Sequence, residues 1–330
     1  TDIKVNNTYR GPLLKTIEQI AESFAPWNPG TELTVGLFSS VVPEFDERAF
    51  REALVNAFGH RDYSVLGRVR VLVDDAGLTI ANPGGFVEGI NVHNLLTAEP
   101  HGRNPCLMDA LKRTGLAERT GRGIDRIFEG ALNYGRPLPD YSRSNGRGVS
   151  VLLPRSAPDE AFVELLAEER ERSGKSMSLD GLLILDKLKR ERRCGFDALS
   201  ESLDMSDQRL RTVLGQLTES GLVESSGTNA RRTYTLGAKV YRRSGKTVEY
   251  VRQSGIDRVR YPELIMKLMR EQKSVSKNDV MELLHLDENQ AYYQLRKLVG
   301  EGRAKKVGGG RNVRYEEMQR DDDGISGEQF

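Results

Sequence analysis

The 330-residue sequence lacks the residue patterns that mark several large classes of protein. It contains only two cysteines, Cys106 and Cys194, and their separation indicates neither a disulfide framework nor a zinc site. We expect both to be ordinary buried thiols. The four histidines, at positions 60, 93, 101 and 285, have no metal-ligand spacing, and no Gly-x-Ser-x-Gly or Walker-type loop occurs. The sequence therefore argues against a disulfide scaffold, a zinc protein, a nucleophile-elbow hydrolase and a P-loop NTPase.

Long apolar runs are also absent. No stretch of about 18 apolar residues occurs, and the first twenty residues have neither the basic start nor the apolar centre of a signal peptide. We therefore expect a cytoplasmic protein without membrane contact. The chain begins with Thr1, which we interpret as the start of a fragment or a processed product. Its length favours two or three domains of about 100 to 150 residues.

Charge is distributed unevenly although the net charge is only +1. Residues 170–320 hold 31 lysines and arginines against 21 aspartates and glutamates, an excess of +10. The rest of the chain holds 18 against 27, or −9. A basic half joined to an acidic half is typical of proteins in which one part binds a polyanion. Chance variation is the alternative explanation.

The basic half contains an internal repeat with an offset of 81 residues. The two copies match without a gap over about 45 residues, from Leu183 and Leu264 to Gly227 and Gly308. Apolar positions are the ones that the two copies share. The repeat therefore predicts two copies of one supersecondary unit, each burying the same face.

Each copy predicts three helices followed by a two-stranded ribbon. In the first copy Ser206 is the expected N-cap of the third helix, and Gly221 is expected to end it. In the second copy Asp287 is the expected cap. Glycines and basic residues then form the ribbon. This arrangement resembles the winged-helix family of bacterial regulators, in which the third helix enters the major groove of DNA and the ribbon, or wing, contacts the backbone.

The resemblance assigns DNA binding to polar residues outside the apolar stripe, because their side chains can hydrogen-bond base edges or phosphates. On the third helices these residues are Gln208, Arg209, Arg211 and Thr212 in the first copy and Asn289, Gln290, Tyr293, Arg296 and Lys297 in the second. On the wings they are Arg231, Arg232, Lys305, Lys306, Arg311 and Arg314. We expect a transcriptional regulator that binds double-stranded DNA, as a homodimer. A protein-interaction module is the alternative, because winged helices also serve that role.

The acidic half has a mixed helix and strand pattern between Glu44 and Pro154. An apolar-rich helix is predicted over residues 50–60, a hairpin over 69–81 and a further strand over 148–153. This pattern predicts a sandwich of helices on an antiparallel sheet. Glu52, Asn56 and His60 stand four residues apart, on one face of the predicted helix.

Three segments of this half resemble the GHKL ATPase fold of histidine kinases, gyrase-type topoisomerases and heat-shock chaperones. Glu52, Asn56 and His60 resemble its N-box, residues 82–85 its adenine-reading box, and residues 120–124 its second glycine box. The resemblance implies that Asn56 holds Mg²⁺ and that Glu52 is the catalytic residue that activates water. It implies that ATP or ADP is bound by Asn56, His60, Asn82, Gly84, Gly85, Gly121 and Gly123.

A divergent branch of that fold matches more of the sequence. Residues 51–64, 82–85, 103–105 and 120–124 closely resemble the RecG-like C-terminal domain of bacterial regulators, and the resemblance extends from about Gly11 to Pro154. In that family a Schlafen-type AlbA domain usually precedes this domain and winged helices often follow it. The AlbA part has no counterpart in this sequence.

Two departures from the GHKL pattern affect the expected chemistry. Asn82 stands where the fold reads the adenine amino group with an aspartate, so this hydrogen bond lacks charge assistance. Phe86 stands where a glycine is expected and would crowd the pocket. Nucleotide binding is thus a hypothesis, and hydrolysis is improbable. In the alternative interpretation, Glu52 and Asn56 only cap or bridge neighbouring elements.

Together these features predict an α+β protein, with a GHKL-like α/β sandwich followed by two winged-helix (helix-turn-helix) domains. We place the GHKL-like domain at 1–154, a charged helical linker at 155–178, the winged helices at 179–245 and 256–318, and a disordered acidic tail at 319–330. A coiled dimer contact is the alternative for the linker. Two further functions stay open: an ATPase that acts on nucleic acid, and a protein-interaction platform in defence or repair.

Overall fold

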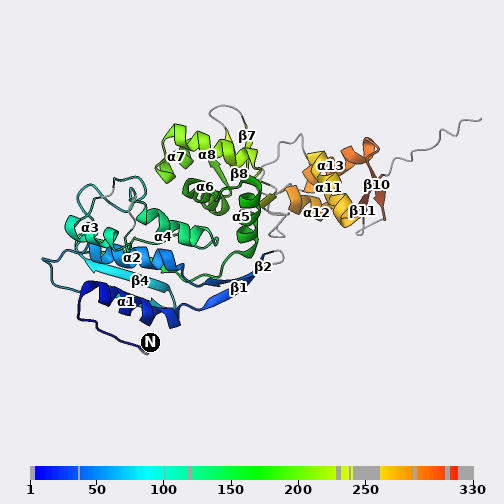
Figure 1. Ribbon diagram of the computed structural model, residues 1–330. Coiled ribbons are helices and arrows are strands. Elements are labelled where there is room, and N and C mark those ends of the chain that lie inside the picture. Colours follow the sequence, from blue (N-terminus) through cyan, green and yellow to red (C-terminus); the bar gives the residue numbers. More distant parts are fainter. Residues whose placement is uncertain are drawn as a thin grey trace, which may run out of the picture. The chain divides into compact units, whose positions relative to one another are not determined.

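The computed structural model divides into two compact units, residues 1–236 and 237–330 (Figure 1). It describes residues 4–35, 38–99, 101–117, 121–227, 232–237, 239–240, 261–284, 288–308 and 313–318. The first unit holds the N-terminal sheet, the charged segment and the first copy of the repeat, and the second unit holds the second copy. The predicted acidic tail, 319–330, lies outside the described residues. The predicted domain boundaries remain predictions.

An antiparallel three-stranded sheet lies at the centre of the N-terminal part. Its strands, in the order β3-β4-β5, are β3 (Arg70–Asp74), β4 (Gly77–Pro83) and β5 (Gly148–Pro154). The β3–β4 turn is fixed by Asp74, whose Oδ1 accepts the backbone N–H groups of Ala76 (2.9 Å) and Gly77 (3.2 Å). The predicted hairpin and the later strand are therefore both present.

Helices cover one face of this sheet (Figure 1). α2 (Glu47–Gly59) lies on β4 and packs along α4 (Gly123–Leu132), while α1 (Leu13–Phe24) and α3 (Pro105–Arg113) both contact α2. The N-cap of α2 is Asp46, whose Oδ1 accepts the N–H of Ala49 at 2.8 Å. α2 and α4 approach closely at Gly130, where a Cβ would lie 2.7 Å from the Cβ of Ala49. The mixed α+β class predicted from the sequence is thus correct.

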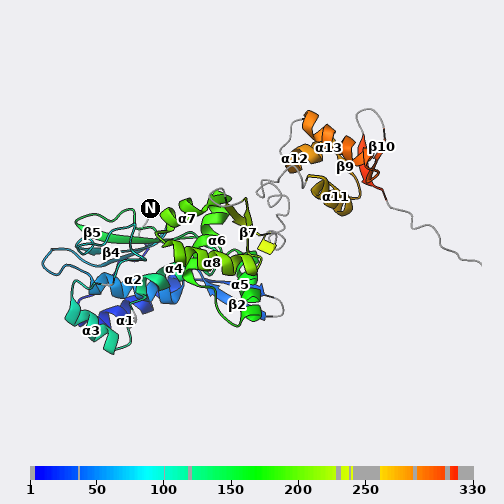
Figure 2. The same cartoon turned by 90° about the horizontal axis from the view of Figure 1, so that it is seen from above.

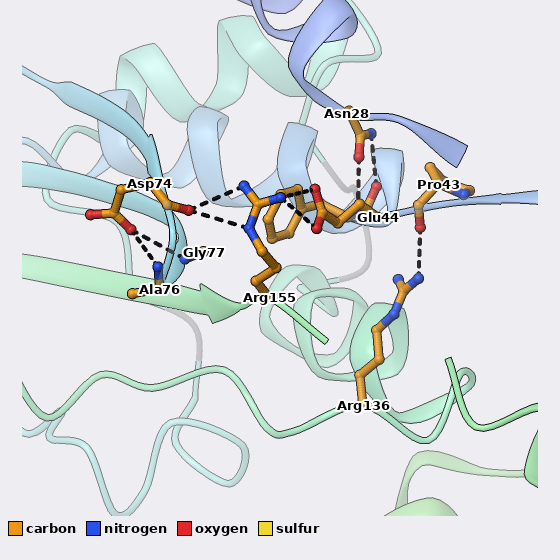
Figure 3. Close-up of polar contacts among 9 residues, drawn as sticks. Asn28, Pro43, Glu44, Asp74, Ala76, Gly77, Arg136 and Arg155 are labelled. Atoms are coloured by element: carbon orange, nitrogen blue, oxygen red, sulfur yellow. Dashed lines mark hydrogen bonds and ion pairs between the residues drawn. The ribbon is translucent and has the colours of Figure 1, made fainter. Parts of the chain in front are cut away.

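The β1–β2 hairpin was not predicted. β1 (Gly30–Val35) and β2 (Phe38–Pro43) pair antiparallel as a sheet of their own. Arg155, just after β5, ties the end of this hairpin to the central sheet (Figure 3). Its guanidinium donates to both carboxylate oxygens of Glu44, at 2.7 and 2.6 Å, and to the carbonyl oxygen of Asp74, at 3.3 and 3.1 Å. Nearby, Arg136 Nη2 donates to the carbonyl oxygen of Pro43 at 2.8 Å.

The charged segment after the sheet forms the helix α5 (Glu160–Ser173), as predicted. Leu165 on this helix is 1% exposed, and α5 contacts β1. Asp159 caps α5 by accepting the N–H of Phe162 at 3.1 Å, and it also pairs with Lys189 at 2.6 Å. The helix is therefore packed into the first compact unit.

The 81-residue repeat relates whole elements in the two units. The first copy contains α6 (Leu179–Glu191), β6 (Arg193–Gly195), α7 (Phe196–Leu203), α8 (Asp207–Glu219), β7 (Val223–Ser226) and β8 (Thr233–Leu236). The second contains α11 (Tyr261–Gln272), β9 (Val275–Ser276), α12 (Lys277–Leu284), α13 (Glu288–Gly300), β10 (Ala304–Val307) and β11 (Arg314–Glu317). α7, α8, β7 and β8 recur with both bounds shifted by 81 residues. Both copies have the same sheet order, β6-β8-β7 and β9-β11-β10.

The predicted apolar stripe forms the core of both copies. Leu210, Leu214 and Leu217 of α8 are buried, as are Ala291 and Leu295 of α13. Because a helix places residues three and four apart on one face, this stripe leaves the polar residues between them exposed.

The ends of α8 agree with the sequence only in part. Gly221 follows the helix with φ +72°, as expected for a terminating glycine. Ser206 occupies the N-cap position, but its side chain makes no capping hydrogen bond, which corrects the prediction of a side-chain cap. The cap predicted at Asp287 for α13 lies outside the described residues.

The two cysteines, both expected to be buried, differ in exposure. Cys194 is buried as predicted, but Cys106 is exposed in the first turn of α3, so the prediction of two buried thiols was wrong for Cys106. Among the described residues, no helix has the length and apolar character needed to cross a bilayer.

Candidate functional site

A cavity of about 350 Å³ lies between α2, β4, the start of α4 and the loop over residues 85–102. Seven of the eight residues assigned to the nucleotide site line it: Glu52, Asn56, His60, Asn82, Gly85, Gly121 and Gly123. Gly84 does not line it. The structure therefore brings together three sequence segments that were singled out separately. Thr120 lies outside the described residues.

Asn82 reaches the cavity because strand residues alternate between the two faces of a sheet. It lies on the same face of β4 as Ile80, toward the helices, and is 7% exposed. Its Nδ2 donates to the carbonyl oxygen of Pro83 at 3.1 Å. No donor from the described residues contacts its Oδ1. This oxygen is thus a free acceptor on a buried residue, and an acceptor is what the recognition of an amino group needs.

Asn56 and His60 approach the cavity from one face of α2, as their spacing predicts. His60 ends the helix, and burial lowers its pKa, with a smaller contribution from the positive charge of Arg103. The imidazole is therefore neutral at pH 7. No described residue forms a hydrogen bond with the side chain of Asn56 or His60.

Among the described residues, no group of three or more histidine, cysteine, aspartate or glutamate side chains is arranged to hold a metal ion. The family's Mg²⁺ role does not require such a group, because Mg²⁺ beside a nucleotide is bound mainly by phosphate and water oxygens with one or two protein ligands. Asn56 can supply one oxygen.

Glu52 lies against the first turn of α4. It is 4% exposed, and a Cβ at Gly123 would lie 2.0 Å from its Oε1 and 2.8 Å from its Cδ. A helix N-terminus stabilises a carboxylate, since its free N–H groups point toward the anion. The negative charge of Glu52 also contributes to raising the pKa of Tyr141, after the larger effect of burial.

This position of Glu52 limits how the cavity fits a nucleotide. The adenine end fits, because Asn82, a buried residue that lines the cavity, offers a free acceptor. At the phosphate end, the carboxylate of Glu52 already lies where the second glycine box would receive phosphate. A bound phosphate would have to share the start of α4 with this carboxylate. The arrangement therefore supports nucleotide binding better than water activation by Glu52.

The two glycines after Asn82 shape the backbone. Gly84 has φ +92°, and its N–H donates to the carbonyl oxygen of Arg147 at 2.9 Å. A Cβ at Gly85 would lie 2.9 Å from the carbonyl oxygen of Asn145. Phe86 lines the cavity, as expected from its position, with its ring centroid 6.3 Å from that of Tyr141. Gly84 thus has a structural role and faces a neighbouring groove instead of the cavity.

Several cavity residues could not be predicted from a sequence pattern. Leu95, Leu96 and His101 come from the loop, Lys112 comes from α3, and Tyr141 precedes β5. The loop has no regular apolar period, and Tyr141 reaches the cavity only through the tertiary fold.

In the first copy of the repeat, the predicted DNA-contacting residues are partly held by other side chains. Arg209 donates to both carboxylate oxygens of Asp180 on α6, each at 2.6 Å. Arg211 lies over the ring of Phe196, 4.4 Å from its centroid. Thr212 Oγ1 donates to the carbonyl oxygen of its neighbour Gln208 at 2.9 Å. Gln208 and Arg232 are exposed, and Arg231 lies outside the described residues.

The first copy also contacts the cavity loop. Thr97 Oγ1 donates to Asp204 Oδ2 at 2.5 Å, and Asp204 lies in the turn between α7 and α8 with φ +49°. α6 packs on α4 within the same compact unit (Figure 2). A hydrogen bond thus joins the loop over the candidate nucleotide site to the turn before α8.

In the second copy, α13 is the helix that corresponds to α8, and its predicted DNA-contacting side chains are exposed. Asn289, Gln290, Tyr293, Arg296 and Lys297 are all exposed, and Tyr293 is 65% exposed. Lys297 contacts Glu301 only at 3.9 Å, while no described residue pairs with Arg296.

On the second wing, Lys305 pairs with Glu316 across the ribbon at 3.4 Å, and Arg314 donates to Ser274 Oγ at 2.9 Å. Lys306 is exposed. Arg311 lies outside the described residues. Among the described residues predicted to contact DNA, the second copy therefore presents two unpaired basic side chains, Arg296 and Lys306, and the first copy presents one, Arg232.

Comparison with known protein families supports the class of the N-terminal part. Residues 67–153 match the family model "Putative ATP-dependent DNA helicase recG C-terminal". This match confirms the resemblance to the RecG-like C-terminal, ATPase-like domain. It includes Asn82 and Gly123, while α2 with Glu52 and Asn56 precedes it.

A solved structure is similar to this chain over most of its length. The crystal structure of the DIP2311 protein from Corynebacterium diphtheriae is 23% identical and covers 93% of this chain, with a TM-score of 0.59. The present chain spans about half of that protein's chain, 54%. This likeness shows a shared fold.

A second match is too distant to indicate a shared fold. The mRNA-binding domain of elongation factor SelB from E. coli, in complex with SECIS RNA, is 15% identical, with a TM-score of 0.18. It covers 43% of this chain and 100% of that domain. Comparison with curated proteins gives no match.

Proposed function

We propose that the two repeated units are winged helices and that the chain is a DNA-binding regulator whose main duplex contact is α13. The observation that carries this proposal is the polar face of α13, where Tyr293, Arg296 and Lys297 are exposed beside a well-packed apolar face. The order helix, strand, helix, helix, strand, strand supports it. In such a unit the third helix enters the major groove and the ribbon contacts the backbone.

Charge adds a second argument. The excess of +10 is spread over the whole of residues 170–320, and a DNA duplex is a polyanion that such a segment can bind. The second copy, residues 261–317, holds 11 lysines and arginines against 9 aspartates and glutamates, and the first copy, residues 179–236, holds nine of each. The two repeated units offer two docking surfaces on one chain, so this proposal does not depend on the homodimer expected from the sequence.

Anisotropy titrations with a labelled 30-base-pair duplex at several KCl concentrations test the proposal. Each phosphate contact steepens the slope of log affinity against log salt by about 0.9. The double variant Arg296→Ala/Lys297→Ala should therefore reduce the slope by about 2 and weaken binding. The matched control Lys267→Ala/Lys273→Asn removes two exposed charges from α11 and the residue just after it, and should leave the slope unchanged. An affinity that does not change with KCl concentration, or an equal loss of affinity in both variants, would contradict the proposal.

We further propose that the cavity binds an adenine nucleotide, ATP or ADP with Mg²⁺, without rapid hydrolysis. The free Oδ1 of Asn82 is the observation that favours this second function, because it can accept a hydrogen bond from the adenine amino group. Glu52 is assigned no catalytic role here. Its carboxylate packs against Gly123 and is 4% exposed, whereas a general base must contact the attacking water.

Calorimetric titration with ADP and Mg²⁺ tests this function through two substitutions of opposite effect. Asn82→Ala should weaken binding by roughly two- to tenfold, the value of one neutral hydrogen bond. Asn82→Asp should strengthen it, because a carboxylate accepts the same bond with charge assistance. Asn133→Ala, at the exposed C-cap of α4, is the matched control. If both Asn82 variants bind like the parent chain, or no variant binds, the assignment fails.

A further inference from the structure

An open groove lies next to the cavity, at the Gly84–Gly85 segment. It has a volume of about 950 Å³. Its floor is backbone from the end of β4 and from the turn at Asn145 and Gly146, which approach each other at Gly85. The groove shares Asn82, Gly85 and Phe86 with the cavity, but no function discussed above uses its arginines Arg68, Arg70 and Arg147.

Arginine side chains gather along the groove. Arg68, Arg70, Arg103 and Arg147 line it, and Asp62 is the one acidic residue among its lining residues. Arg103 is held in place, since it pairs with Asp62 at 3.4 Å and donates to the carbonyl oxygen of Gly85 at 2.8 Å. The other three are exposed, and no ion pair or hydrogen bond to a described residue holds their guanidinium groups.

This concentration of positive charge stands out in a half of the chain that is net negative. Outside residues 170–320 the balance is −9, yet four arginines face one acid here. Three unpaired guanidinium groups around one groove repel each other unless an anion lies between them. Arginine pairs with phosphate through two parallel hydrogen bonds, so phosphate groups are suitable anions for this groove.

The rim of the groove is apolar and pre-formed. Leu66 is 99% exposed and Val65 is 43% exposed. The loop that carries them is fixed by Arg61, whose Nη2 donates to the carbonyl oxygens of Val65 (3.3 Å) and Gly67 (2.9 Å). A ligand therefore meets apolar side chains that need little further ordering.

We propose that this groove binds single-stranded nucleic acid, with the arginines on its phosphates and the apolar rim against its bases. A duplex keeps the faces of its bases stacked inside the helix, so Leu66 cannot pack on them. A single strand presents phosphates and base faces together, so it can contact the arginines and the apolar rim at the same time. The groove is a separate site from α13, so this proposal does not rest on duplex binding.

Anisotropy titration of the full chain with a labelled 12-nucleotide oligo-dT tests the proposal. The variant Arg68→Gln/Arg70→Gln/Arg147→Gln should weaken binding at least tenfold at low salt. It should also reduce the salt slope by about 2, since each single-strand phosphate contact contributes about 0.7. Leu66→Ser should weaken binding several-fold without changing the slope.

The control variant Arg48→Gln/Arg51→Gln/Arg170→Gln removes the same charge from exposed positions elsewhere in the same unit and should bind like the parent chain. The α13 double variant should keep single-strand binding while losing duplex binding, which separates failure of this proposal from failure of the proposed function. Equal losses in the groove and control variants would overturn the proposal. So would displacement of oligo-dT by free tripolyphosphate at the same phosphate concentration, because the site would then be one for a small anion.

Discussion

A pair of glycine substitutions tests the position of Glu52, on which the account of the nucleotide cavity depends. A methyl group at Gly123 would lie 2.0 Å from Glu52 Oε1, so the buried carboxylate must leave the start of α4. Overpacking costs about 1–3 kcal/mol, and a displaced buried polar group costs about 1–3 kcal/mol more. Alanine's better helix propensity recovers at most about 1 kcal/mol. We expect Gly123→Ala to destabilise the first unit by about 2–4 kcal/mol.

Gly215→Ala is the matched control. Gly215 lies within α8 in the same compact unit, and nothing lies within 4 Å of an added Cβ. This substitution should stabilise by about 0.5–1 kcal/mol, because alanine loses less backbone entropy in a helix.

Thermal unfolding followed by circular dichroism measures both variants. At about 2–4 °C per kcal/mol for a unit of this size, Tm should fall by roughly 5–15 °C for Gly123→Ala and rise by roughly 1–4 °C for Gly215→Ala. An unchanged or higher Tm for Gly123→Ala would refute the packing of Glu52 against α4.

Three further outcomes follow from the structure. Asp180→Asn releases Arg209 from its ion pair, so it should raise duplex affinity by roughly two- to fivefold in gel-shift titrations; a loss of affinity would mean that α8 needs this pair. Burial lowers the pKa of His60 in the folded state, so protonation favours unfolding, and stability should be full above about pH 7.5 and decrease as the pH falls through about 6.5. Urea titrations at pH 8 and 5.5 should show a smaller pH effect in His60→Gln, and an equal effect in both proteins would contradict it. Burial, aided by the hydrogen bond to Glu191, raises the pKa of Cys194 to about 11, so a thiol reagent at pH 8 should label Cys106 quickly and Cys194 only on unfolding; rapid labelling of both would contradict this burial.

The repeat and the cavity face of α2 could be predicted because each follows from the period of a helix. Leu214 and Leu295 occupy equivalent places since both must be buried, and burial keeps residue type constant between copies. Glu52 and Asn56 reach one cavity because four residues are about one helical turn. Local rules of this kind need only the sequence within one element.

Other features depend on contacts between distant segments. The ion pair Arg209–Asp180 joins residues 29 positions apart in the sequence. The sequence pattern of α8 alone predicts a free basic face, but in the fold Asp180 neutralises part of it. The strands β6 and β9 have only three and two residues, too few for an alternating pattern. Glu52 lies against Gly123 through the packing of α2 on α4, which no motif describes.

Hydrogen exchange of the full chain, with and without a saturating 30-base-pair duplex, is the measurement that tests duplex binding most directly. The account predicts slower exchange in peptides from α13 and β11, with smaller changes in α8, whose arginines are partly paired. It predicts no change along β3 and β4, which border the arginine groove. Protection confined to β3 and β4, with α13 exchanging at the same rate in both samples, would contradict it.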